Sequence, residues 1–214
     1  RDPGRMLSRI LELGQASDLR SSANLYRSMV SHWQSPQNLC EASDEAVSEA
    51  WQWGAKNDFL DAATMARVID FYTYLPDDIL VKVDRATMHV GLEARTPFLD
   101  REVLDWSTQL PPRFTLRGES GKWVLKEVLS QYVPRPMFDR PKMGFGVPLA
   151  SWLRGPLREW ASDLLSPQML KESGFVNTHL VEEKWRAHLA GEDWAYPIWN
   201  ILMFQSWLEF EKGE

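Results

Sequence analysis

A mainly helical fold is predicted for the 214-residue chain, with one core and no internal boundary between residues 1 and 214. Apolar residues recur at three- and four-residue spacing over most of the sequence, which is the period of an α-helix. Proline, glycine and aspartate separate these segments at short intervals and indicate turns. The stretch that suggests a strand, RFTLRG at 113–118, is short.

Composition restricts the class of protein. The chain is 44% hydrophobic and 25% charged, which is typical of a globular domain. Its net charge of −6 disfavours nonspecific binding to nucleic acid. The one cysteine, Cys40, has no partner for a disulfide, and we expect it to be buried or inert. There is neither an apolar run of roughly 18–20 residues that could span a bilayer nor a signal peptide, so a cytoplasmic location is expected.

Two successive helices are expected between residues 57 and 90. Asn57 or Asp58 is the candidate cap of a helix that runs to about Leu75, where Pro76 ends it. Asp77 is the candidate cap of the next helix. This second helix has a polar stripe formed by Asp78, Lys82, Arg85 and His89. Its apolar stripe, which we expect to face the core, consists of Ile79, Val83, Ala86 and Val90. By spacing alone, the polar stripe is more typical of a solvated face than of a binding site.

Further helices are expected along the rest of the chain. Asp100 can cap a short helix through Trp106, and the segment 121–133 forms another helix that ends at Pro134. Breaks are expected near Gly155–Pro156 and before residues 194–200. The eleven tryptophans mostly lie at helical spacing with other apolar residues, so we interpret them as anchors of helix packing.

A glycine-containing loop, DRPKMGFGVPL at 139–149, is the second candidate for a site. Gly144 and Gly146 flank Phe145 and would let backbone amides approach a ligand closely, while Lys142 offers a compact cation for phosphate. The alternative is a glycine turn with a surface lysine. GESGK at 118–122 is interpreted as a turn, because only two residues separate its glycines where a phosphate loop has four. No metal site is expected, since His89 has no second ligand at suitable spacing.

Two segments together resemble the synthetase domain of the glutamine-hydrolysing asparagine synthetases. YLPDDILVKVDRATMHVGLEARTPFLD and RPKMGFGVPLASWLRGPLRE occur in the order of that family, and GKWVLKEVL between them is similar as well. The family's N-terminal glutaminase domain and its Ser-Gly-Gly-x-Asp-Ser pyrophosphate loop do not occur in the sequence. The resemblance therefore implies a helical C-terminal portion of an α/β synthetase domain of the PP-loop type, with the parallel sheet largely missing.

The resemblance also implies the chemistry of the intact enzyme. A carboxylate, aspartate or similar, would be adenylated by ATP and converted to an amide with glutamine-derived ammonia, giving AMP, pyrophosphate and glutamate. ATP with Mg²⁺ is expected in the intact enzyme, whereas the fragment is predicted to be inactive and to have no cofactor bound. Expected partners are the missing glutaminase domain and PP-loop sheet and a small carboxylate, without nucleic acid or membrane. A homodimer of the intact protein is left open.

The family motifs assign roles to particular residues. Lys142 would stabilise the α-phosphate transition state and the pyrophosphate, and Arg85 or Lys82 would approach the phosphates. Glu93 would orient or deprotonate the amine nucleophile. Arg95 would hold Glu93 or the substrate carboxylate, and Asp84 would support the site. The loop over the nucleotide would be shaped by Gly144, Phe145 and Gly146. These roles require the Lys142 loop and the helix face at Lys82 to converge on one phosphate-sized hollow.

Two alternatives remain. The chain could be a helical interaction module without catalysis, whose acidic and tryptophan-rich surface docks a partner protein. It could also belong to a relative that acts on another carboxylate, as in β-lactam closure or sugar-acid amidation. Thr96 departs from the valine often found in the family, and residues 1–55 contain no motif that separates these alternatives.

Overall fold

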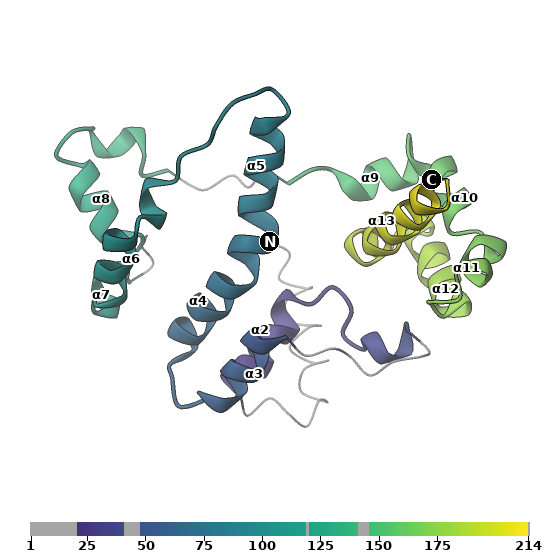
Figure 1. Cartoon of the computed structure of the whole chain (residues 1–214), viewed down its shortest axis with the longest axis horizontal. Helices are drawn as coiled ribbons and strands as arrows, with labels where there is room; N and C mark the ends of the chain where they lie inside the picture. The colour runs from purple at the N-terminus through teal and green to yellow at the C-terminus, as the bar shows by residue number, and fades with distance from the viewer. Residues whose placement is uncertain (1–20, 41–47, 119, 141–145, 214) are drawn as a thin grey trace. The chain divides into compact units, whose positions relative to one another are not determined.

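The computed structural model describes residues 21–40, 48–118, 120–140 and 146–213, and these residues are mainly helical, as predicted (Figure 1). The chain divides into two compact units. The first unit comprises Arg1–Ile79 and Val147–Glu214, and the second unit comprises Leu80–Gly146. The assignment of residues 1–214 to a single domain stays a prediction.

Among the described residues, three α-helices form the N-terminal part of the first unit. They are α2 (Ser22–Val30), α3 (Glu49–Lys56) and α4 (Ala62–Tyr72), and the 3₁₀-helix η1 (Pro36–Asn38) follows α2. A small core of Ala23, Met65 and Ile69 lies between them. Gly54 lets the helices approach closely, because a Cβ there would lie 3.1 Å from the Cβ of Ala23.

The predicted cap of α4 was wrong. Asp61 is the N-cap, and its side chain accepts hydrogen bonds from the backbone N–H groups of Ala63 and Thr64. Asp58 is used elsewhere, since its carboxylate accepts from the hydroxyl of Ser21 and the N–H of Ser22 at the start of α2. Sequence spacing could not reveal this contact, because its partners lie 36 and 37 residues away.

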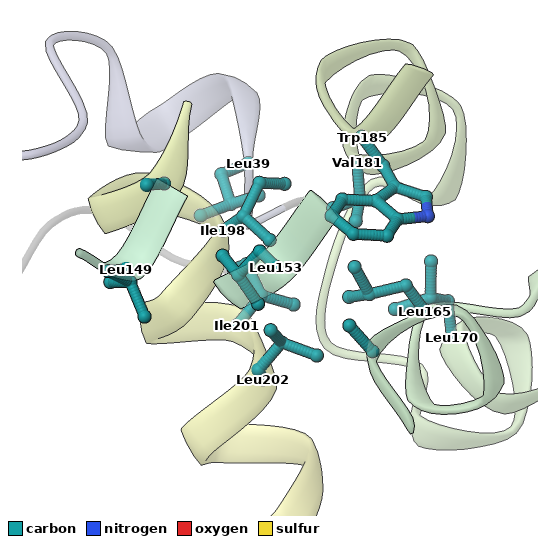
Figure 2. Packing of buried hydrophobic residues seen from close by; sticks show 12 residues of the cluster. Leu39, Leu149, Leu153, Leu165, Leu170, Val181, Trp185, Ile198, Ile201 and Leu202 are labelled. Atoms are coloured by element: carbon teal, nitrogen blue, oxygen red, sulfur yellow. The ribbon is translucent and has the colours of Figure 1, made fainter. Parts of the chain in front are cut away.

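Five helices form the C-terminal part of the first unit: α9 (Leu149–Arg154), α10 (Arg158–Leu164), α11 (Pro167–Ser173), α12 (Thr178–Leu189) and α13 (Ala195–Lys212). Their buried side chains meet in a core that includes Leu153, Leu202 and Trp185 (Figure 2). Leu39, which follows η1, joins this core, and its carbonyl accepts a hydrogen bond from the N–H of Asn177. Trp33, Trp194 and Trp199 pack against it, which confirms a packing role for these tryptophans.

The second unit contains α5 (Val81–Met88), η3 (Pro97–Leu99), α6 (Arg101–Thr108), α7 (Pro112–Thr115), α8 (Trp123–Leu129) and η4 (Arg135–Met137). Asp100 caps α6, as predicted, by accepting a hydrogen bond from the N–H of Glu102. The strands β1 (Leu116–Arg117) and β2 (Ser120–Gly121) pair antiparallel, with Leu116 opposite Gly121. Gly118 lies in a turn and Ser120–Gly121 form β2 just before α8, in agreement with the predicted turn, while residue 119 lies outside the described residues. Only Leu116–Arg117 of RFTLRG form a strand.

The segment between α4 and α5 differs from the prediction. The π-helix η2 (Leu75–Leu80) leads directly into α5, and the N–H of Asp77 donates to the carbonyl of Thr73. Asp77 is therefore not a helix cap. Pro76 lies in the first turn of η2, where its missing N–H costs no helical hydrogen bond.

The apolar stripe of α5 is not buried in this chain. Val90 is 73% exposed, and no residue of α5 itself is buried. The prediction that this stripe faces the core was therefore wrong for the described residues. Cys40 is also exposed, so of the two expectations for it, buried or inert, burial does not hold. Within the described ranges, no helix is both long and apolar enough to cross a membrane.

Candidate functional site

The cations predicted to bind phosphate lie on the surface of α5. Lys82 and Arg85 are three residues apart, so they share one face of the helix, and both are exposed. Asp84 is exposed as well, about 100° around the helix from Arg85. α5 therefore presents two cations to solvent in the second unit, as a phosphate-binding face would.

Glu93 and Arg95 form an ion pair immediately after α5. The Nε atom of Arg95 lies 2.9 Å from Oε1 of Glu93, and both side chains are exposed. Gly91 has a φ of 69°, a left-handed conformation that favours glycine, and the N–H of Leu92 donates to the carbonyl of Thr87. The helix therefore ends before Glu93, which places the carboxylate on the loop that follows α5 instead of on the polar stripe.

The glycine loop is described only at its two ends. Lys142, Gly144 and Phe145 lie outside the described residues, so the expected convergence of Lys142 with Lys82 stays a prediction. Gly146 is exposed, and a Cβ added to it would meet no atom within 4 Å. Among the described residues, therefore, no neighbouring atom would prevent a side chain at position 146.

The described start of the loop is held by two ion pairs. Lys126 Nζ lies 2.8 Å from Oδ1 of Asp139, and Arg135 Nη2 lies 2.6 Å from Oε1 of Glu127. The hydrogen bond from Lys126 lowers the pKa of Asp139, and the hydrogen bond to Glu127 raises the pKa of Arg135. Both shifts favour the charged forms of Asp139 and Arg135. These four residues were not predicted as site residues; the adjacent Lys126 and Glu127 on the helix before the loop were the signal in the sequence.

The described residues do not offer a ready metal site. In the ranges that the structure covers, no three side chains of His, Cys, Asp or Glu gather closely enough to hold an ion. Magnesium prefers carboxylate, phosphate and water oxygens in octahedral geometry.

A shallow hollow of about 350 Å³ lies on the first unit at the start of α9. Its lining includes Pro148, Arg154 and Tyr196. The guanidinium of Arg154 already donates to two backbone carbonyls, those of His188 at 2.7 Å and Glu192 at 2.6 Å. This arginine serves helix packing, so the hollow is a weaker candidate for anion binding than the face of α5.

Comparison with known proteins decides the family. The model of the asparagine synthase family matches residues 4–209 of the chain. The chain belongs to the asparagine synthase family. The resemblance inferred from the motifs around Glu93 and Lys142 is thereby confirmed.

Several members of this family have similar sequences. The chain is 31% identical over 140 residues to "Asparagine synthetase [glutamine-hydrolyzing] 1" of Bacillus subtilis, which covers 65% of this chain and 22% of that protein. It is 36% identical over 149 residues to "Putative asparagine synthetase [glutamine-hydrolyzing]" of Mycobacterium bovis, a match that covers 69% of this chain and 22% of that protein. The "Asparagine synthetase [glutamine-hydrolyzing] 2" of Arabidopsis thaliana is 32% identical over 115 residues, which cover 48% of this chain and 20% of that protein. The chain thus spans about a fifth of the length of these relatives. No solved structure matches it significantly.

Proposed function

We propose that the protein containing these residues is an ATP-dependent amide synthetase, and that this chain supplies the helical C-terminal portion of its synthetase domain. The match of the asparagine synthase family over residues 4–209 carries the proposal. The exposed cations of α5 and the exposed Glu93–Arg95 pair agree with it. Aspartate and glutamine are the first substrates to test, because the similar proteins are named glutamine-hydrolysing asparagine synthetases.

The first step would be adenylation of the substrate. An oxygen of its carboxylate attacks the α-phosphate of ATP, and the bond to pyrophosphate breaks. Negative charge grows on the leaving pyrophosphate, and positioned cations lower the energy of that transition state. Lys142, together with Arg85 or Lys82, would supply these cations, while Gly144, Phe145 and Gly146 would shape the loop over the nucleotide.

The second step would use the Glu93–Arg95 pair. Ammonia from glutamine attacks the acyl carbon, and AMP leaves with the electrons of the broken C–O bond. The attacking nitrogen must lose a proton, and the carboxylate of Glu93 can accept it. Arg95 holds Oε1 of Glu93 at 2.9 Å and so restricts the orientation of the carboxylate. Asp84 would support α5 near the same site.

Magnesium would enter with ATP and neutralise part of the phosphate charge. The phosphates of ATP would supply oxygen ligands to the ion, which are the ligands that magnesium prefers. Asp84 and Glu93 are the carboxylates of the candidate site that could contact its water ligands. The roles proposed above for Asp84 and Glu93, support of α5 and acceptance of a proton, do not depend on such a contact.

Exposed apolar side chains favour contact of the second unit with further polypeptide. Tyr132 is 78% exposed, and Val90, Phe98 and Met137 are also largely exposed. Soluble monomers seldom expose contiguous apolar surface without an interaction partner. In the proposed enzyme, the nucleotide-binding sheet would cover this surface and the glutaminase domain would complete the protein. The same surface favours the second candidate, an interaction module without catalysis.

The proposal can be tested with the full-length protein. Amide, AMP and pyrophosphate are measured with aspartate, glutamine and Mg-ATP. Lys142→Ala and Glu93→Gln should each lower kcat by about 100-fold or more, whereas the control Glu102→Gln, an exposed glutamate on α6, should stay within about twofold. Glu93→Gln should retain exchange of pyrophosphate into ATP, because Glu93 acts after adenylation.

Two results would reject this assignment. Amide synthesis near the wild-type rate in both variants would remove Lys142 and Glu93 from the chemistry. A full-length protein that releases no AMP with aspartate or other carboxylates would favour the interaction module instead.

A further inference from the structure

The hollow at the start of α9 is lined by groups of opposite charge. Arg154 belongs to α9, Asp193 lies between α12 and α13, and both line this space of about 350 Å³. Volumes of about 300 Å³ and above are typical of sites for small molecules. The Nη2 atom of Arg154 donates to the carbonyl of Glu192 at 2.6 Å. Because that carbonyl carbon is bonded to the backbone nitrogen of Asp193, the guanidinium is held beside the backbone of the aspartate.

Both charged groups are held in place and can still bind a further partner. Oδ1 of Asp193 accepts a hydrogen bond from the N–H of Ala195 at 3.1 Å, which fixes the carboxylate at the start of α13. A carboxylate has two oxygens with several acceptor positions, so this bond does not saturate it. Arg154 uses Nε and Nη2 for the carbonyls of His188 and Glu192, so its Nη1 group donates to neither carbonyl. The hollow therefore offers a fixed acceptor and a fixed donor of opposite charge.

Much of the remaining lining is apolar or aromatic. Val147, Pro148 and Tyr196 line the hollow, and Tyr196 is 47% exposed. The ring of Tyr196 packs against that of His32, with 5.5 Å between the ring centroids. Nδ1 of His32 lies in turn 3.1 Å from Nδ2 of Asn200. These contacts restrict the tyrosine ring, so the aromatic wall is already formed.

The combination of charges and walls selects a class of ligand. A simple anion such as phosphate would be repelled by Asp193, and a simple cation by Arg154, whereas a zwitterion satisfies both. A free α-amino acid carries both charges on one carbon atom. We propose that the hollow binds a free α-amino acid with an apolar side chain. Its carboxylate contacts Arg154, its ammonium group contacts Asp193, and its side chain lies against Tyr196. This site does not depend on the proposed function, because aspartate and glutamine have polar side chains.

The first test compares L-leucine with its analogues on the full-length protein, by saturation-transfer NMR. Leucine should bind with a Kd of about 1 mM or lower, as expected for a small ligand in an open hollow. Isocaproate lacks the ammonium group and isoamylamine lacks the carboxylate. Each should displace leucine only at about fivefold higher concentration or more, because one charged contact is lost. L-Aspartate should also require about fivefold more, because its side chain would place a second carboxylate against the apolar wall.

The second test locates the ligand with a variant that preserves the fold. Asp193→Asn should weaken leucine binding about fivefold or more, because the charge that faces the ammonium group is lost. Asparagine still accepts the hydrogen bond from Ala195, so the start of α13 keeps its cap. The same variant should not weaken the binding of isocaproate, which has no ammonium group. The matched control is Asp61→Asn, a capping aspartate at the start of α4, which should leave leucine binding within about twofold.

Tyr196→Ala serves as the second variant if Asp193→Asn does not fold, and it should weaken leucine binding about threefold or more because the aromatic wall is lost. Absence of leucine binding up to about 10 mM would overturn the proposal. Equal displacement by leucine, isocaproate and isoamylamine would overturn it as well, since the charges would then play no part. Leucine binding that is unchanged in both variants would place the ligand elsewhere. None of these outcomes bears on amide synthesis, which is measured separately.

Discussion

Arg154 connects α9 to the C-terminal end of α12, and its replacement should measurably destabilise the first unit. Its Nε donates to the carbonyl of His188 and its Nη2 to the carbonyl of Glu192. The carbonyl of His188 lies in the last turn of α12 and also accepts from the N–H of Gly191, whereas Glu192 follows the helix, so Arg154 supplies an additional donor at each carbonyl. Arg154→Met would remove both donors and keep most of the apolar stem.

The expected loss follows from the burial of the two hydrogen bonds. A hydrogen bond from a charged donor contributes about 1.5 kcal/mol or more when it is shielded. The hydrogen bond to His188 is part-buried, so the larger value applies to it. The hydrogen bond to Glu192 is exposed and should contribute about 0.5 kcal/mol to the free energy of unfolding. The free energy of unfolding should therefore fall by about 2 kcal/mol. Arg154→Lys should lose about 1 kcal/mol, because an ammonium cannot reproduce the two-pronged geometry of the guanidinium.

Urea unfolding followed by tryptophan fluorescence measures these differences. The control is Arg158→Met, an exposed arginine in the first turn of α10, which should change the free energy of unfolding by less than about 0.5 kcal/mol. The slope of unfolding against urea should be the same in all variants. A loss below about 0.5 kcal/mol in Arg154→Met, or an equal loss in Arg158→Met, would refute this account of Arg154.

Two further predictions concern pH and the nucleotide. Burial, followed by the charge of Arg154, holds the pKa of His188 below its ordinary value of 6.5, so the unfolded chain binds a proton more readily. The contribution of His188 to the free energy of unfolding should therefore be complete above about pH 6.5 and decrease below it, by at most about 1.4 kcal/mol per pH unit. Urea unfolding at about pH 7.5 and 5.5 should show a smaller decrease in His188→Gln than in wild type, and an identical decrease would contradict this role. Residues 1–214 alone should bind Mg-ATP weakly in isothermal titration, because the resemblance locates the pyrophosphate loop outside them, and tight saturable binding would contradict that expectation.

Local signals allowed several elements to be predicted from the sequence. Asp100 caps α6 because its side chain reaches an N–H only two residues away. The turn before α8 follows from its glycines, and Gly118 does adopt a positive φ of 59°. These features depend on a few adjacent residues, so neither required knowledge of the tertiary contacts.

Features that depend on distant residues could not be predicted in this way. Asp58 was a plausible cap for α4, but Ser21 and Ser22 engage it at the start of α2. The spacing of Val83 and Val90 indicates which face of α5 is apolar, yet it does not show whether the chain itself contains a partner for that face. The Lys126–Asp139 pair joins residues 13 apart, and no helical period reveals it.

The sequence predicted the family and the candidate residues of the site, but not how these residues are arranged in space. The motifs around Glu93 and Lys142 indicated the asparagine synthase family, and the comparison over residues 4–209 confirms that membership. The pairing of Glu93 with Arg95 is one of the two partnerships that the family resemblance implied for Arg95. The meeting of Lys142 with the face of α5 stays a prediction, because it depends on residues outside the described ranges.

The open apolar face of α5 has a practical use in mutational scanning. Val83 and Val90 are both exposed in these 214 residues. A stability screen of the isolated chain should therefore accept aspartate or lysine at either position. A parallel screen of the full-length protein would reject those substitutions wherever other polypeptide covers the helix, and the difference between the two tolerance maps would outline that contact residue by residue.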